Sequence, residues 1–96
     1  MQLEEAEKIL RTHRQELFQR GVRKLALFGS TVRNQAKPSS DIDILVDFEA
    51  KRGMFLFVNL KIYLEKILKC KVDLVTKNSL HPALKKRILS EAKEIF

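Results

Sequence analysis

The stretch LALFGSTVRNQAKPSSDIDILVDF, residues 25–48, decides the fold, because two apolar segments flank a polar loop. The first segment ends at Gly29-Ser30 and predicts a short strand. The loop is rich in turn-forming Asn, Pro and Ser residues. The second segment alternates with the period of a strand, so Ile42, Ile44 and Val46 share one face and Asp41, Asp43 and Leu45 share the other.

Outside this stretch, apolar periodicity predicts three helices and a third strand. The first helix begins near Leu3 and is closed by Gly21, and a third strand spans KVDLVT, residues 71–76. The second helix, from Gly53, has an inward stripe of Phe57, Leu60, Leu64, Ile67 and Leu68. The last helix has Pro82 in its first turn and an expected stripe of Leu84, Ile88, Ala92 and Ile95. We therefore expect one α+β domain, residues 1–96, with helices packed on a small mixed sheet of three or slightly more strands.

Charge and composition narrow the class of protein. The chain has 96 residues and a net charge of +7. The whole excess lies in residues 51–96, which hold 11 basic and 4 acidic side chains. Such a surface suits polyphosphates, nucleic acid or an acidic partner, but taken alone the charge is explained better by solvated helix faces rich in lysine. No segment resembles a membrane span or a secretion signal, and the single cysteine, Cys70, excludes an internal disulfide, so we expect a cytoplasmic protein.

Aspartates inside apolar strands are the strongest chemical signal. Asp43 and Asp73 each interrupt an apolar strand, and Asp41 shares the face of Asp43. Carboxylates close together repel one another unless a cation neutralises them, and oxygen-only ligands suit magnesium or manganese. A single aspartate of this kind would more simply face solvent or pair with a lysine. Three that can converge favour a metal site, while Asp47, at the strand end, is expected to be peripheral.

The Gly29-Ser30 pair supplies a place for phosphate groups. Glycine lets the backbone approach an anion closely, and Ser30 offers an N–H and a hydroxyl group. Magnesium held by carboxylates usually completes its coordination with substrate phosphates. A Gly-Ser pair alone is common in turns, so the signal depends on its fixed spacing from the downstream carboxylates.

Gly29-Ser30, ten residues, and then Asp41-x-Asp43 resembles the signature of the polymerase-beta-like nucleotidyltransferase superfamily. Asp73 in KVDLV matches the third carboxylate of that family, and the ending LHPALKKRILSEAKEIF is similar to the tail of its smallest members. The resemblance covers essentially the whole chain. It indicates the minimal nucleotidyltransferases, many of which are antitoxins paired with a small helical toxin of the HEPN class.

The resemblance implies a site and a reaction. Asp41, Asp43 and Asp73 would hold two Mg²⁺ ions, or Mn²⁺, and act as the catalytic carboxylates, while Gly29, Ser30 and Arg33 would bind the phosphates of ATP. AMP would pass to a hydroxyl group, in the antitoxin relatives a tyrosine of the all-helical HEPN-type toxin. The chain departs from the family at Val32 and at Arg33-Asn34, where relatives carry a small residue and Arg-Gly.

Two other functions stay open. A non-catalytic antitoxin would neutralise its partner by occlusion, and the intact set of carboxylates argues for the enzyme instead. A nucleic-acid-binding domain would suit the basic second half, but the chain has one Tyr, no Trp and no interleaved aromatic platform, so direct nucleic-acid binding is the least favoured function. The apolar segment MFLFV, residues 54–58, either packs on the sheet or forms a partner-binding patch.

Overall fold

The computed structural model describes residues 1–33 and 41–96, so the predicted loop at 34–40 lies outside the described residues. The helices are α1 (Leu3–Thr12), α2 (Arg14–Gln19), α3 (Gly53–Leu68) and α4 (Pro82–Glu91). The strands are β1 (Val22–Phe28), β2 (Ile42–Phe48), β3 (Val72–Thr76) and β4 (Lys93–Glu94). Short 3₁₀ turns follow β1, β2 and β3, at Gly29–Thr31, Ala50–Arg52 and Lys77–Ser79.

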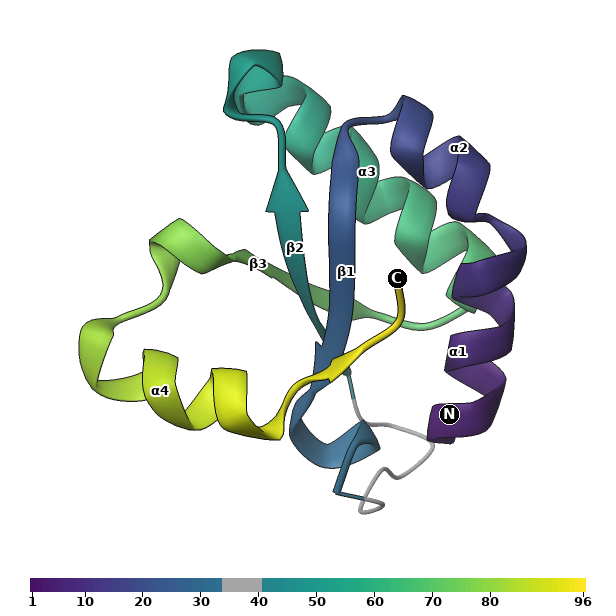
Figure 1. The fold of residues 1–96 in the computed structure, drawn as a ribbon. Coiled ribbons are helices and arrows are strands. Elements are labelled where there is room, and N and C mark those ends of the chain that lie inside the picture. The colour runs from purple at the N-terminus through teal and green to yellow at the C-terminus, as the bar shows by residue number, and fades with distance from the viewer. Residues whose placement is uncertain (34–40) are drawn as a thin grey trace.

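The described strands form one mixed sheet in the order β3-β2-β1-β4. β1 is antiparallel to both β2 and β4, whereas β2 and β3 are parallel. Parallel strands need a long crossover, and α3 supplies it between β2 and β3 (Figure 1). The predicted α+β class and mixed sheet are confirmed, with β4 as an additional strand.

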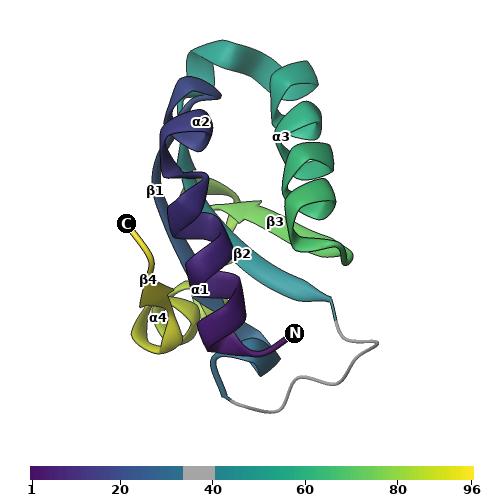
Figure 2. The ribbon, with the colours of Figure 1, turned by 90° about the vertical axis from the view of Figure 1, so that its right-hand side faces the viewer.

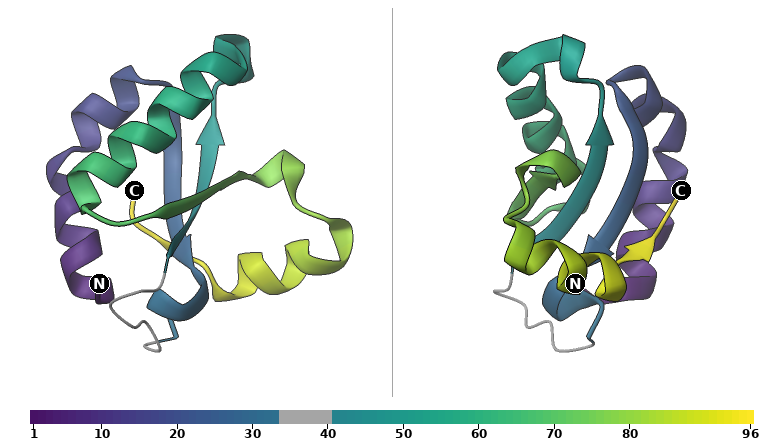
Figure 3. Two further views of the ribbon diagram at one scale, coloured as in Figure 1. Left: turned by 180° about the vertical axis from the view of Figure 1, so that it is seen from behind. Right: turned by 60° about the vertical axis from the view of Figure 1, so that its left-hand side comes forward.

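α1, α2 and α3 cover one face of the sheet, and α4 lies on the other side (Figures 2 and 3). The core lies beneath the first three helices, because the apolar face of β2 packs there against the buried stripe of α3 formed by Leu60, Leu64 and Leu68. The opposite face of β2 carries Asp43, which is half-buried. None of the described helices is both long and apolar enough to cross a membrane.

The single first helix predicted from periodicity is wrong, because the helix breaks at His13. His13 has φ −99° and ψ 14°, outside the helical region, and ends α1 before α2 begins. Its Nδ1 lies 2.8 Å from the carbonyl oxygen of Ile9, and its ring meets Tyr63 edge to face. The histidine is therefore a packed structural residue. Gly21 closes the helical segment as predicted, with φ 102°.

The inward stripe predicted for the last helix is also wrong. α4 ends at Glu91, none of its residues is buried, and Leu84 is 51% exposed. Ile95 is buried, but it follows β4 instead of continuing the helix. His81 caps α4 by accepting a hydrogen bond from the Ala83 N–H, and Pro82 occupies the first turn as expected. α4 therefore stands over the sheet without contributing to the core.

The segment at residues 54–58 is largely exposed instead of packed on the sheet. Met54 and Phe55, at the start of α3, are 75% and 78% exposed, and only Phe57 is half-buried. Phe57 meets the ring of Phe48 edge to face. Of the two interpretations that the sequence left open, partner binding is the one compatible with this exposure.

Candidate active site

The turn that follows β1, residues 29–33, is called the Gly29 turn below. Gly29 has φ 75°, a conformation that L side chains rarely adopt. A Cβ atom at this position would collide with Oδ2 of Asp43 and lie 3.0 Å from its Cγ. Glycine is required here for two reasons, the backbone conformation and the space taken by a carboxylate on the neighbouring strand.

Asp43 and Asp73 lie side by side across the sheet. The parallel register of β2 and β3 pairs them directly, and the antiparallel register of β1 and β2 places Asp43 opposite Phe28, next to Gly29. Paired residues of adjacent strands point to the same face. The structure thus brings together three of the predicted site residues, Gly29, Asp43 and Asp73.

Burial and neighbouring negative charge make Asp43 a weaker acid than usual. Its pKa is raised from 3.8 to about 6, first by partial burial and then by the charge of Asp73, a hydrogen bond with Asp73 and the charge of Asp41. Arg33 acts in the opposite direction. A carboxyl group with a strongly raised pKa in a partly open site is typical of functional positions.

The three aspartates have the right ligand chemistry for a divalent cation, but their side chains are not gathered closely enough to hold one. Asp41, exposed just before β2, acts on Asp43 through its charge, and all three donors are carboxylates, the ligand type that Mg²⁺ prefers. Within residues 1–33 and 41–96, no three acidic, His or Cys side chains are close enough to hold an ion together. Asp43 and Asp73 form the preformed pair, and Asp41 lies near enough to act on Asp43 through its charge.

The other predicted residues lie in the Gly29 turn itself. Ser30 is half-buried in its 3₁₀ segment, and Arg33 is exposed at its end. Arg33 pairs with Glu91 of α4, at 2.8 Å between Nη1 and Oε1. Glu91 was not among the predicted site residues. A glutamate in a charged helix carries no sequence signal for a contact with a turn some sixty positions earlier.

With this geometry established, comparison with known proteins identifies the family. Residues 7–95 match the model of the nucleotidyltransferase domain family. The chain belongs to this family.

The nucleotidyltransferase is similar to proteins of the minimal type. It is 50% identical over 90 residues to the protein adenylyltransferase MntA of Thermococcus cleftensis, covering 93% of this chain and 91% of that protein. A solved minimal nucleotidyltransferase has a TM-score of 0.77 and 34% identity, covering 97% of this chain and 95% of that one. A toxin–antitoxin crystal structure with AMP-PNP has a TM-score of 0.69 and 26% identity, covering 93% and 68%. The resemblance read from the sequence is confirmed.

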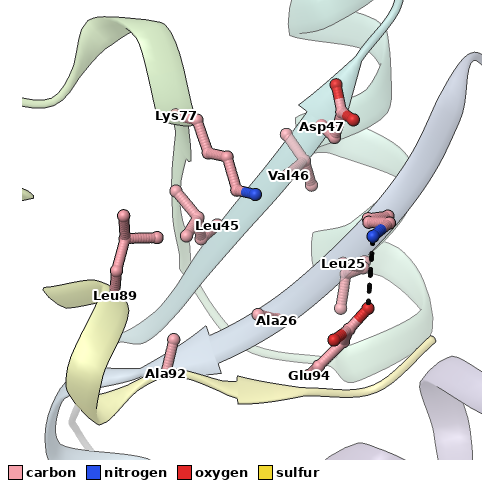
Figure 4. A pocket seen from close by; sticks show the side chains of 10 residues that line it. Leu25, Ala26, Leu45, Val46, Asp47, Lys77, Leu89, Ala92 and Glu94 are labelled. Carbon is pink, nitrogen blue, oxygen red and sulfur yellow. Dashed lines mark ion pairs between the residues drawn. The ribbon is translucent and has the colours of Figure 1, made fainter.

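The nucleotidyltransferase has a hollow of about 200 Å³ on the Asp43 side of the sheet (Figure 4). Ala26 and Leu45 form part of its lining. Leu89 of α4 and Ala92, the residue after that helix, close one side, and Lys77 reaches in from another. Leu45 follows Asp43 on the same face of β2, so the hollow is adjacent to the carboxylates. It exists because α4 stands away from the sheet.

Asp43→Asn should stabilise the metal-free nucleotidyltransferase at neutral pH. The folded-state pKa of Asp43, about 6, is above the unfolded value, so the stability that this group contributes is fully present below about pH 4 and is lost as the pH rises from 4 through 6. After allowance for solvent screening we expect a gain of about 1 kcal/mol at pH 7 to 8, or roughly 4–8 °C in Tm.

Melting curves of the wild type and of Asp43→Asn with EDTA, from pH 3.5 to 8, would measure this. The gain should develop between about pH 4 and 7 and be absent at pH 3.5. Asp47→Asn is the matched control, since Asp47 is exposed on the same strand and should not change Tm. A lower Tm for Asp43→Asn at pH 8 would mean that Asp43 is a structural ion-pair partner.

Proposed function

We propose that this nucleotidyltransferase transfers AMP from ATP to a hydroxyl group of a partner protein, a tyrosine of a small all-helical HEPN-type toxin, and acts as its antitoxin. The observation that carries the proposal is the opposed pair of Asp43 and Asp73 beside the Gly29 turn. The name of the archaeal relative supports adenylyl transfer to protein, and the toxin–antitoxin structure with AMP-PNP supports an adenine nucleotide and a toxin partner.

In this proposal Asp41, Asp43 and Asp73 hold two Mg²⁺ ions, for which Mn²⁺ could substitute. Such ions stabilise the charge on the entering and leaving oxygens of an in-line displacement. The role of the carboxylates is to fix the cations at the α-phosphate. After burial, the negative charges of Asp73 and Asp41 raise the pKa of Asp43, and a bound cation would offset that repulsion.

The Gly29 turn would bind the β- and γ-phosphates of ATP. Ser30 supplies its hydroxyl and backbone N–H, and Arg33 adds positive charge near Asp43. The partner's hydroxyl oxygen then forms a bond to the α-phosphorus as its proton is released to solvent, and the bond between that phosphorus and the pyrophosphate leaving group breaks. The chain is too small to enclose a large substrate, so the partner has to bring its own acceptor into the open site.

The alternative is an antitoxin that neutralises the toxin by occlusion. The observation that favours it is the exposed apolar surface of Met54 and Phe55 at the start of α3, which would bind a partner without any chemistry. Both proposals place the protein in the cytoplasm, in keeping with its one cysteine, which is half-buried and has a pKa raised by burial.

The test is incubation of the protein with MgATP and its co-encoded helical protein, followed by intact mass measurement of both chains. We expect the partner to gain the mass of one or more AMP groups. MgATP alone should also raise the Tm, because a ligand at about 100 times its Kd adds about 2.7 kcal/mol to folded-state stability. A neutralised partner of unchanged mass would support occlusion and contradict transfer.

A further inference from the structure

Glu91, at the end of α4, binds both ends of the Gly29 turn. Its Oε1 accepts a hydrogen bond from the Gly29 N–H at 2.8 Å and from Nη1 of Arg33 at 2.8 Å. Figures 1 and 3 show the last turn of α4 beside the turn that follows β1. The Glu91 side chain is only 19% exposed, so its carboxylate is largely shielded from solvent, although none of the residues of α4 is fully buried.

The position of Glu91 follows from the register of the sheet edge. β4 pairs Lys93 with Leu27 and Glu94 with Ala26, so the same antiparallel register would place residue 91 opposite Gly29. Glu91 is the last residue of α4, so it does not pair with Gly29 as a strand residue would. Instead, the Glu91 side chain accepts the hydrogen bond from the Gly29 N–H that a backbone carbonyl group of a longer β4 would accept. Gly29 is buried, and a buried N–H without an acceptor is costly.

The second contact holds the far end of the turn. The Arg33 N–H donates to the Gly29 carbonyl oxygen at 3.1 Å, which closes the backbone of the turn, and the Arg33 side chain returns to Glu91. One carboxylate oxygen therefore fixes the peptide before Gly29 and the guanidinium group after it. Hydrogen bonds to an ionised acceptor are stronger than those between neutral groups.

We infer that Glu91 is a positioning residue, which holds the Gly29 turn and the Arg33 guanidinium in the arrangement that receives the nucleotide phosphates. The inference rests on the proposed function for the identity of the ligand. Glu91 itself touches neither the substrate nor the reacting atoms. It acts by keeping the turn in one conformation before the nucleotide arrives, so the nucleotide does not have to order it.

The test compares the wild type with Glu91→Ala, Glu91→Gln and Glu16→Ala in binding of Mg-AMP-PNP by calorimetry, without any partner. Glu91→Ala should weaken binding about 10-fold, the effect of losing one charge-assisted hydrogen-bond acceptor. Glu91→Gln should recover part of the affinity, because its amide oxygen still accepts from the Gly29 N–H. Glu16→Ala removes a similar Arg–Glu pair on α2 and should bind like the wild type.

Hydrogen exchange of the Gly29 amide measures how firmly the Gly29 turn is held in the absence of nucleotide. It should be faster in Glu91→Ala, intermediate in Glu91→Gln and unchanged in Glu16→Ala. If Glu91→Ala binds Mg-AMP-PNP as tightly as the wild type or more tightly, the inference is wrong; tighter binding would make Glu91 a competitor of the phosphates. If the wild type binds no nucleotide at all, the proposed function fails together with the inference.

Discussion

Replacing Asp41 and Asp43 together with asparagine should reduce AMP transfer on the order of 1,000-fold or more. Metal ions stabilise transition-state charge by several kcal/mol, and each 1.36 kcal/mol corresponds to a factor of ten in rate. The variant keeps the size of both side chains but loses the charges that would fix the ions. It should fold at least as stably as the wild type, because burial and then the neighbouring charge of Asp73 disfavour the ionised form of Asp43.

The measurement is the rate of mass gain on the partner, with the Tm of each variant recorded in EDTA. Asp47→Asn controls for the loss of a negative charge on β2, because Asp47 is exposed and farther along the strand from Asp73. It should transfer AMP at the wild-type rate. A double variant that still transfers at that rate would show that the carboxylates are not the reaction site.

Much of the candidate site could be predicted because its residues follow local rules. Strand alternation alone places Asp43 on the face opposite Ile42 and Ile44, and both isoleucines are buried. The pairing of Asp43 with Asp73 is harder to predict from the sequence. It depends on how far α3 carries the chain before β3 begins, and a slip of one residue would put Asp73 on the other face.

The features that the sequence did not predict depend on contacts between distant segments. β4 is only Lys93–Glu94, too short for any strand signal, and it exists because β1 offers an edge. The apolar spacing of Leu84 and Ile88 resembles a buried helix face, yet α4 packs on no core. Glu91 belongs to the same group, since only the β4 register brings it to Gly29.

Gly29→Ala is expected to have the second largest effect, through loss of both stability and activity. Alanine at φ 75° is strained by about 1–2 kcal/mol, and its Cβ would in addition meet the Asp43 carboxylate. Either Asp43 turns away from Asp73 or the Gly29 turn moves, and both outcomes disrupt the proposed site. We expect about 2–4 kcal/mol of destabilisation and nearly complete loss of AMP transfer.

Gly53→Ala is a matched control for the destabilisation caused by backbone strain alone. Gly53 also has φ 75°, but an added Cβ would meet nothing within 4 Å. It should cost about 1–2 kcal/mol, the strain alone, and leave transfer near the wild-type rate. The excess cost at Gly29 then measures the collision with Asp43.

A double-mutant cycle with Asp43→Ala tests that assignment in urea unfolding. Asp43→Ala removes the oxygen that the new Cβ would strike, so in that background Gly29→Ala should cost little more than Gly53→Ala. A coupling energy of about 1 kcal/mol or more between positions 29 and 43 would show that glycine is needed there to make room for the carboxylate. If the two free-energy changes are purely additive, the whole effect of Gly29→Ala comes from backbone strain. The close approach of Asp43 to the Gly29 turn would then not explain why glycine is needed there.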